Sequence, residues 1–147
     1  MYLISACLCG LNCKYNGASN FNPKVKALFD KENCIAICPE HLGNLSIPRE
    51  PHEIVGGEGK DVLKGTAVVL SKKGCDNTKK FIDGAYRTLD IAKLFNAHTA
   101  ILKARSPSCG WGHIYDGSYQ GKLKPGNGVA AELLNQNGIK ILSEDDI

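Results

Sequence analysis

The sequence lacks the features that would direct a protein into or across a membrane. No apolar run approaches the length of about 18 residues that predicts a membrane-spanning helix. The N-terminal stretch MYLISACLCGLNC starts apolar, but no basic segment precedes it, and Gly, Asn and Cys interrupt it at once. We therefore expect neither a signal peptide nor a membrane contact, and we predict a cytoplasmic protein.

The sequence also has little excess charge of either sign. Its 147 residues include 18 Lys and Arg against 15 Asp and Glu, which gives a formal net charge of +3. So small an excess does not by itself indicate a nucleic-acid partner. The basic pairs Lys72-Lys73 and Lys79-Lys80 are typical of solvated surface, with a phosphate-binding patch as the alternative. We expect a small-molecule partner and no nucleic acid.

A CxxC pair is absent, although the chain has seven cysteines. In the cytoplasm thiols are kept reduced, and the odd number argues against a set of disulfides, so metal ligation or thiol chemistry is the leading explanation. Zinc sites usually show a CxxC pair or nearby His ligands, and only His41, close to Cys38, is available here. A redox pair of Cys7 and Cys13 would lack both the usual spacing and a helix N-terminus directly after the thiol.

The length fits a single domain, residues 1–147, with 43% hydrophobic and 22% charged residues. Strands alternate with helices along the chain, which predicts an α/β protein with a three-layer, Rossmann-like fold. Its sheet is expected to be mostly parallel, with helices on both faces. We predict a loop over residues 40–59 and a small hairpin of 61–63 with 67–70. The predicted strands are 2–7, 34–38, 99–103 and 139–142, and the predicted helices are 22–31, 78–95 and 129–137.

Three cysteines end a predicted strand or follow one closely. Cys7 and Cys38 are the last residues of two such strands, and Cys109 follows the third in the segment Ser106-Pro107-Ser108-Cys109-Gly110. Since ligands bind at the carboxyl ends of the strands in open α/β sheets, we expect these thiols to meet at one edge. Burial as small hydrophobic residues is the alternative. That alternative is favoured for Cys34 and Cys75, whereas Cys9 remains undecided.

Four collinear blocks of residues span almost the whole chain and form a recognisable set of motifs. They are Ser5-Ala6-Cys7-Leu8 with Gly10 and Cys13-Lys14-Tyr15-Asn16-Gly17; Cys38-Pro39-Glu40 with Ile47-Pro48-Arg49, Glu53-Ile54 and Gly56-Gly57; Lys103 and Ser106–Gly110 with Ile114–Gly117; and Gly126–Ala130 with Gly138–Glu144. In these blocks the sequence resembles the thiouracil desulfidases, a family long catalogued as a domain of unknown function. It departs from the family pattern at Cys9, where an apolar residue is expected.

The resemblance implies a [4Fe-4S] cluster bound by Cys7, Cys38 and Cys109, with the fourth iron open to substrate. It implies a non-redox reaction in which the C=S bond of a thiolated pyrimidine, as a free base or nucleoside, becomes C=O by hydrolysis. A soft sulfur prefers a thiophilic iron, and an iron that binds it polarises the C=S bond. The main alternative is a metal- or Fe–S-binding sensor or sulfur-handling protein without this activity.

Several other residues are candidates for the reaction on this reading. Glu40 is a candidate general acid or base, and its alternative is a helix-start or surface residue. Ser106 is a candidate for substrate binding or proton relay, with a turn-forming Ser as the alternative. Trp111 and Tyr115 would stack on a base or pack in a lid. The predicted substrate contacts are Cys13, as a pocket thiol, Asn16 and Ser108.

Overall fold

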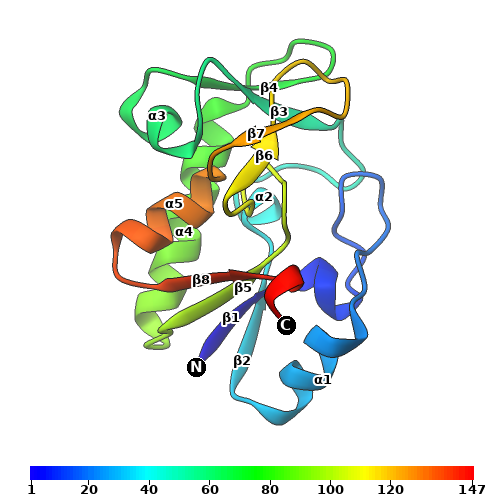
Figure 1. Ribbon diagram of the computed structural model, residues 1–147, viewed down its shortest axis with the longest axis vertical. Coiled ribbons are helices and arrows are strands. Elements are labelled where there is room, and N and C mark those ends of the chain that lie inside the picture. The colour runs from blue at the N-terminus through cyan, green and yellow to red at the C-terminus, as the bar shows by residue number, and fades with distance from the viewer.

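The centre of the molecule is a parallel sheet, shown in Figure 1 as a computed structural model of residues 1–147. Its strands run in the order β2-β1-β5-β8, and every neighbouring pair is parallel. The chain thus passes from β1 to β2 on one side and then returns to β5 on the other side of β1. The strands are β1 (Tyr2–Ser5), β2 (Cys34–Ile37), β5 (Thr99–Leu102) and β8 (Lys140–Ser143).

Helices cover both faces of this sheet, as predicted. Because successive side chains of a strand point to opposite faces, Leu3 and Ile4 enter different cores. Leu3 belongs to the larger core with Phe81 of α4 (Thr78–Leu94) and Leu134 of α5 (Val129–Gln136). Ile4 belongs to the smaller core beneath α1 (Pro23–Lys31), together with Ile101 and Val25. The predicted three-layer α/β class is therefore confirmed.

The starts of the helices follow from local chemistry. The Asn22 side chain accepts hydrogen bonds from the amides of Lys24 and Val25 at 3.0 and 3.2 Å, and Pro23 takes the first helical position of α1. The Thr78 amide donates to the Asp76 carboxylate at 2.9 Å at the start of α4. Gly128 occupies the cap position of α5.

The segment between β2 and α4 differs from the prediction. Residues 61–63 lie in a helix, so the predicted hairpin with 67–70 is wrong, and the predicted loop 40–59 contains a helix and a strand. A capping box explains the helix, since the Asp61 carboxylate accepts the Glu58 amide at 2.9 Å. The elements are α2 (Pro39–Leu42), β3 (His52–Val55), α3 (Gly59–Lys64) and β4 (Val68–Ser71), with β3 and β4 antiparallel.

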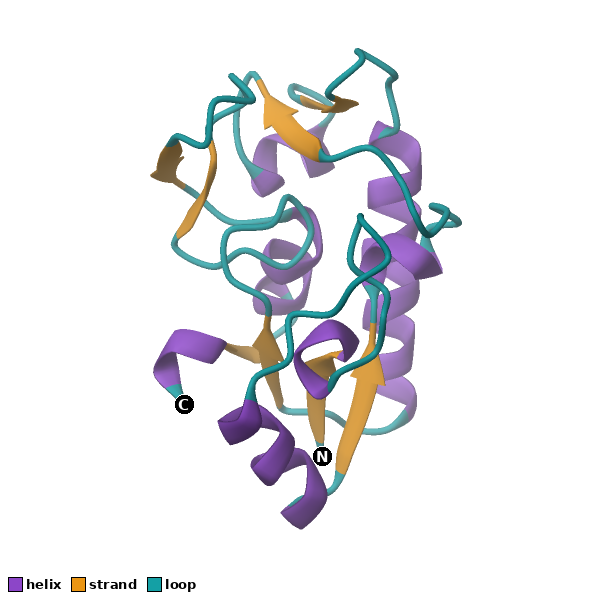
Figure 2. Ribbon diagram, turned by 90° about the vertical axis from the view of Figure 1, so that its right-hand side faces the viewer, coloured by secondary structure: helices purple, strands orange, loops and turns teal.

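Short elements complete the structure around the carboxyl ends of the sheet. Figures 1 and 2 show the β3–β4 pair, and the β6 (His113–Tyr115) and β7 (Leu123–Pro125) pair, on the side of the molecule toward which the parallel strands run. Two 3-10 turns, η1 (Ala6–Cys9) and η2 (Glu144–Asp146), directly follow β1 and β8. None of the helices has both the length and the apolar character needed to cross a membrane.

Two glycines allow α2 to pack closely on α4. A Cβ atom on Gly84 would lie 2.1 Å from the Pro39 carbonyl oxygen, and one on Gly43 would lie 2.1 Å from the Lys80 carbonyl oxygen. Both neighbours are backbone atoms that cannot move aside alone. The contact therefore fixes the position of Pro39, and with it the adjacent Cys38 and Glu40.

We predict that Gly84→Ala destabilises the protein by about 2 kcal/mol. Overpacking costs about 1–3 kcal/mol, and the helix propensity of Ala, worth roughly 1 kcal/mol, offsets only part of a clash with backbone. Urea denaturation would measure the change in the free energy of unfolding. Asp90→Ala, at an exposed position of the same helix, is the control. Equal stability of the two variants would show that the contact is not tight.

Candidate active site

A cavity of about 500 Å³ lies at the carboxyl ends of the parallel strands. Its walls include residues that follow β1, β2 and β5, together with residues of β3 and of the β6–β7 segment. In open α/β sheets a crevice forms where the strand order reverses, and here that point lies between β1 and β5. The topology therefore places the cavity where a ligand site is expected.

The three cysteines that follow the strands all line this cavity. Cys7 lies in η1, directly after β1, and is 9% exposed. Cys38 follows β2 and is half-buried, and it is the cap residue of α2. Cys109 follows β5 after a short loop and is 5% exposed. The structure thus brings together three thiols that are far apart in the sequence.

Serine side chains hold the Cys109 loop. The Ser106 hydroxyl accepts the Cys109 amide at 2.7 Å, and the Ser5 hydroxyl donates to the Cys109 sulfur at 3.5 Å. Gly110 continues the turn with an amide that donates to the Ser106 carbonyl at 2.9 Å. A Cβ atom on Gly110 would lie 2.6 Å from that same carbonyl oxygen, so the turn requires glycine. The Ser–Pro–Ser–Cys–Gly segment therefore holds the Cys109 thiol in a fixed position at the cavity.

A fourth thiol, Cys13, enters the cavity between two of the others. As a hydrogen-bond donor to either of these thiolates, the Cys13 thiol lowers the pKa of Cys7 and lowers the pKa of Cys38 to about 6. Its single hydrogen serves one partner at a time, and donation raises the pKa of Cys13 itself. Burial raises the pKa of Cys109 to about 12, against the opposing effect of the Ser5 hydrogen bond. A thiol that binds a metal gives up its proton, so ligation would ionise Cys109 despite its burial.

Glu40 is held at both of its carboxylate oxygens. Oε1 accepts Arg49 Nε at 3.0 Å, and Oε2 accepts the Ser108 hydroxyl at 2.8 Å. The side chains of Arg49 and Glu40 are 6% and 14% exposed. Arg49 also donates to the Cys13 carbonyl at 2.9 Å, so one guanidinium fixes both the carboxylate and the Cys13 backbone. Ser106 and Ser108 lie within hydrogen-bond distance of each other, at 3.3 Å.

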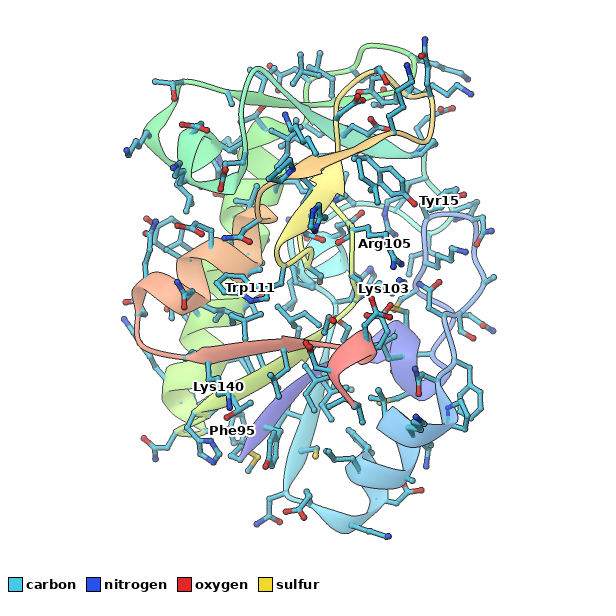
Figure 3. All side chains as sticks on the ribbon, viewed as in Figure 1. Tyr15, Phe95, Lys103, Arg105, Trp111 and Lys140 are labelled. Carbon is cyan, nitrogen blue, oxygen red and sulfur yellow. The ribbon has the colours of Figure 1, made fainter.

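Two predicted contacts lie outside the cavity. Asn16 does not line it, and its amide oxygen accepts the Ala18 amide at 3.0 Å to close a turn. The predicted substrate contact by Asn16 has no support in this geometry. Trp111 does not line the cavity but packs against the larger core, and Figure 3 shows it well away from Tyr15. Tyr115 does line the cavity.

Other cavity residues were not singled out as site residues from the sequence. Lys103 and Arg105 line the cavity and lie right of the centre in Figure 3, on the same side of the molecule as Tyr15. Lys103 forms an ion pair with Glu144 of η2. Glu53 is a buried carboxylate of β3 on the cavity wall. Its place in the Glu53-Ile54 motif was the only sequence signal, because its surroundings depend on contacts distant in the chain.

Comparisons with known proteins agree with these motifs. The sequence matches the 2-thiouracil desulfurase family over residues 2–146. The chain belongs to this family. Among its relatives is the uncharacterized protein YbbK of Bacillus subtilis (strain 168), which is 47% identical over 147 residues, covering 100% of this chain and 97% of YbbK. A solved structure, the [4Fe-4S]-dependent thiouracil desulfidase TudS, is 34% identical with a TM-score of 0.86, covering 99% of this chain and 91% of that one.

The donor set of this family member suits an iron–sulfur cluster. Fe–S clusters are bound by Cys thiolates, and hydrogen bonds to the sulfurs tune them. The cavity offers cysteines from three neighbouring strands, and the Ser5 hydroxyl donates to the Cys109 sulfur at 3.5 Å. No three His, Cys, Asp or Glu side chains gather around a single ion position. Each thiolate of such a site binds a different iron, so a cluster does not need thiols gathered at one point.

Proposed function

We propose that this protein removes the sulfur of a thiolated pyrimidine of the thiouracil type by non-redox hydrolysis. The reaction breaks the C=S bond and forms C=O, with water supplying the oxygen. The sulfur leaves as hydrogen sulfide, and no electrons are gained or lost. The observation that carries this proposal is the meeting of three strand-end cysteines at one cavity in a chain of the 2-thiouracil desulfurase family.

In this proposal Cys7, Cys38 and Cys109 hold a [4Fe-4S] cluster. When bound, the cluster supplies a thiophilic Lewis acid, an iron without a protein ligand, for the thiocarbonyl sulfur. The three cysteines anchor it from three different strands, and Ser5 donates to the sulfur of Cys109. Cys13 remains a pocket thiol beside Cys7 and Cys38, close to the bound substrate.

In this proposal Glu40 accepts a proton from the attacking water. Arg49 and Ser108 fix the orientation of its carboxylate, so it receives a proton without first turning toward the substrate. Ser106 lies next to Ser108, and the two hydroxyls extend the hydrogen-bonded path from Glu40 along the cavity wall. Ser106 therefore relays a proton or binds the substrate, while Ser108 positions Glu40 and contacts the ring.

The size and lining of the cavity support a small substrate. A volume of about 500 Å³ lies within the range of small-molecule sites, roughly 300–1,000 Å³. A thiolated base or nucleoside fits this volume, whereas a folded nucleic acid would have to contact a much larger surface. We therefore expect free thiolated pyrimidines as substrates, and we propose that the reaction takes place in the cytoplasm.

Turnover after anaerobic reconstitution tests this function. The iron-loaded protein is incubated with 2-thiouracil and with 4-thiouracil without an added reductant. We expect uracil and sulfide in equal amounts, and ¹⁸O from labelled water in the uracil. Protein stripped of iron by a chelator is the control and should be inactive. A fully loaded protein that leaves both compounds unchanged would favour the sensor or sulfur-handling alternative.

A further inference from the structure

The mechanism above leaves one buried carboxylate of the cavity unused. Glu53 lies in β3, opposite Leu70 of β4, and the residue is only 8% exposed. No Lys, Arg or His forms an ion pair with it. A buried carboxylate is costly unless its charge is compensated by a cation or by hydrogen bonds.

The two oxygens of Glu53 have different surroundings. Oε1 accepts the amide of Gly117 at 2.9 Å and that of Tyr119 at 3.2 Å, which ties the loop after β6 to β3. No group of the protein donates to Oε2, and since no fully buried polar side-chain atom lacks a partner, Oε2 is accessible to solvent. Since Glu53 lines the cavity, and the amides fix the orientation of the carboxylate, Oε2 is a preoriented acceptor for a ligand. Glu40 differs, because the protein occupies both of its oxygens.

The position of β3 determines which part of a substrate meets this acceptor. Figure 1 shows β3 across from the carboxyl ends of β1, β2 and β5, where the three cysteines lie. A pyrimidine whose sulfur faces the cysteines therefore directs the opposite edge of its ring toward the β3 wall. In 4-thiouracil the ring atom opposite C4 is N1, which carries a hydrogen. In 2-thiouracil the atom opposite C2 is C5, which offers no comparable donor.

We propose that Oε2 of Glu53 accepts a hydrogen bond from N1–H of 4-thiouracil and so sets both the orientation and the preferred isomer of the substrate. This rests on the proposed desulfidase function and deepens it. The contact forms on binding and does not change during reaction at C4. Loss of the contact therefore raises KM and leaves kcat nearly unchanged.

Glu53→Gln tests the proposal with little disturbance of the loop. The Gln carbonyl still accepts the Gly117 and Tyr119 amides, while an NH₂ group replaces the free acceptor. We expect KM for 4-thiouracil to rise about 10-fold or more, the range for a hydrogen bond to a charged group, with kcat within about threefold. For 1-methyl-4-thiouracil, which has no N1–H, the wild type and the variant should have the same KM. Glu50→Gln, at a partly exposed site before β3 where Glu50 pairs with Lys73, is the matched control.

Equilibrium binding separates this proposal from the function on which it rests. Titration calorimetry of the iron-loaded protein compares uracil with 1-methyluracil, and it needs no turnover. Wild-type protein should bind uracil about 10-fold more tightly than 1-methyluracil, and Glu53→Gln should abolish the difference. Equal weakening of both ligands in the variant would identify loop damage and overturn the proposal. An unchanged preference in the variant would also overturn it, whatever the result of the turnover assay.

Discussion

Replacing Cys7, Cys38 or Cys109 by Ser, one at a time, is expected to remove most of the iron from the protein. Each cysteine follows a different strand of the sheet, so no other ligand on the same loop takes its place. A serine hydroxyl is a hard, weakly acidic group that does not replace a thiolate on iron. After anaerobic reconstitution we expect iron and acid-labile sulfide to fall about 10-fold or more, and visible absorption and desulfidase activity to fall with them.

Other cysteines of the chain provide matched controls for this experiment. Cys75→Ser changes an exposed thiol in a turn before α4, and Cys34→Ser changes a half-buried one at the start of β2. Both variants should keep full iron. Cys13→Ser should also keep iron, because Cys13 is proposed as a pocket thiol. If a Cys7, Cys38 or Cys109 variant binds as much iron as the wild type while remaining folded by circular dichroism, the assigned ligand set is wrong.

The position of the cavity could be anticipated because it depends on local signals. Short apolar runs ending at Cys7 and Cys38, and one followed by Cys109, are readable as strands without knowledge of their partners. Parallel strands all present their carboxyl ends at one edge, so residues that follow them meet there. The structure places all three at one cavity for this reason.

The wall of the cavity formed by β3 could not be predicted from local sequence signals. Residues 61–63 are apolar enough for a strand, but the Glu58 and Asp61 capping box starts a helix there. The true partner of β4 is β3, within a segment that prolines and glycines make resemble a loop. Without β3, neither the burial of Glu53 nor its contacts with Gly117 and Tyr119 can be foreseen.

The ion-pair partner of Arg49 also could not be predicted from the sequence. Arg49 stands in the same motif block as two carboxylates, Glu40 and Glu53, and the sequence alone does not decide between them. In the structure it pairs with Glu40 at 3.0 Å, because α2, packed closely against α4 at Gly84, places Glu40 at the cavity. Whether Arg49 pairs with Glu40 or Glu53 depends on how the helices pack, and the local sequence pattern does not show this packing.

That pairing makes Glu40→Gln the most informative test of the chemistry. Gln has nearly the same shape, and its carbonyl still accepts either Ser108 or Arg49, but it does not take up a proton. We expect kcat for 4-thiouracil to fall by about 10²–10⁴-fold, the usual contribution of a general acid or base, with iron content unchanged. Stopped assays of uracil formation, normalised to iron, measure the effect. Glu40→Ala is less suitable, since leaving a buried Arg49 unpaired costs about 3–5 kcal/mol.

Glu144→Gln is the matched control for this substitution. Glu144 is also a largely buried carboxylate in an ion pair, with side-chain exposure of 11%, and it accepts the Ala104 amide at 2.7 Å. It lies at the same edge of the sheet but does not line the cavity. The two variants should therefore lose comparable stability, whereas only Glu40→Gln should lose more than about 10-fold in kcat. A Glu40→Gln protein with kcat within about threefold of the wild type would assign the proton transfer to another group and reduce Glu40 to a partner for Arg49.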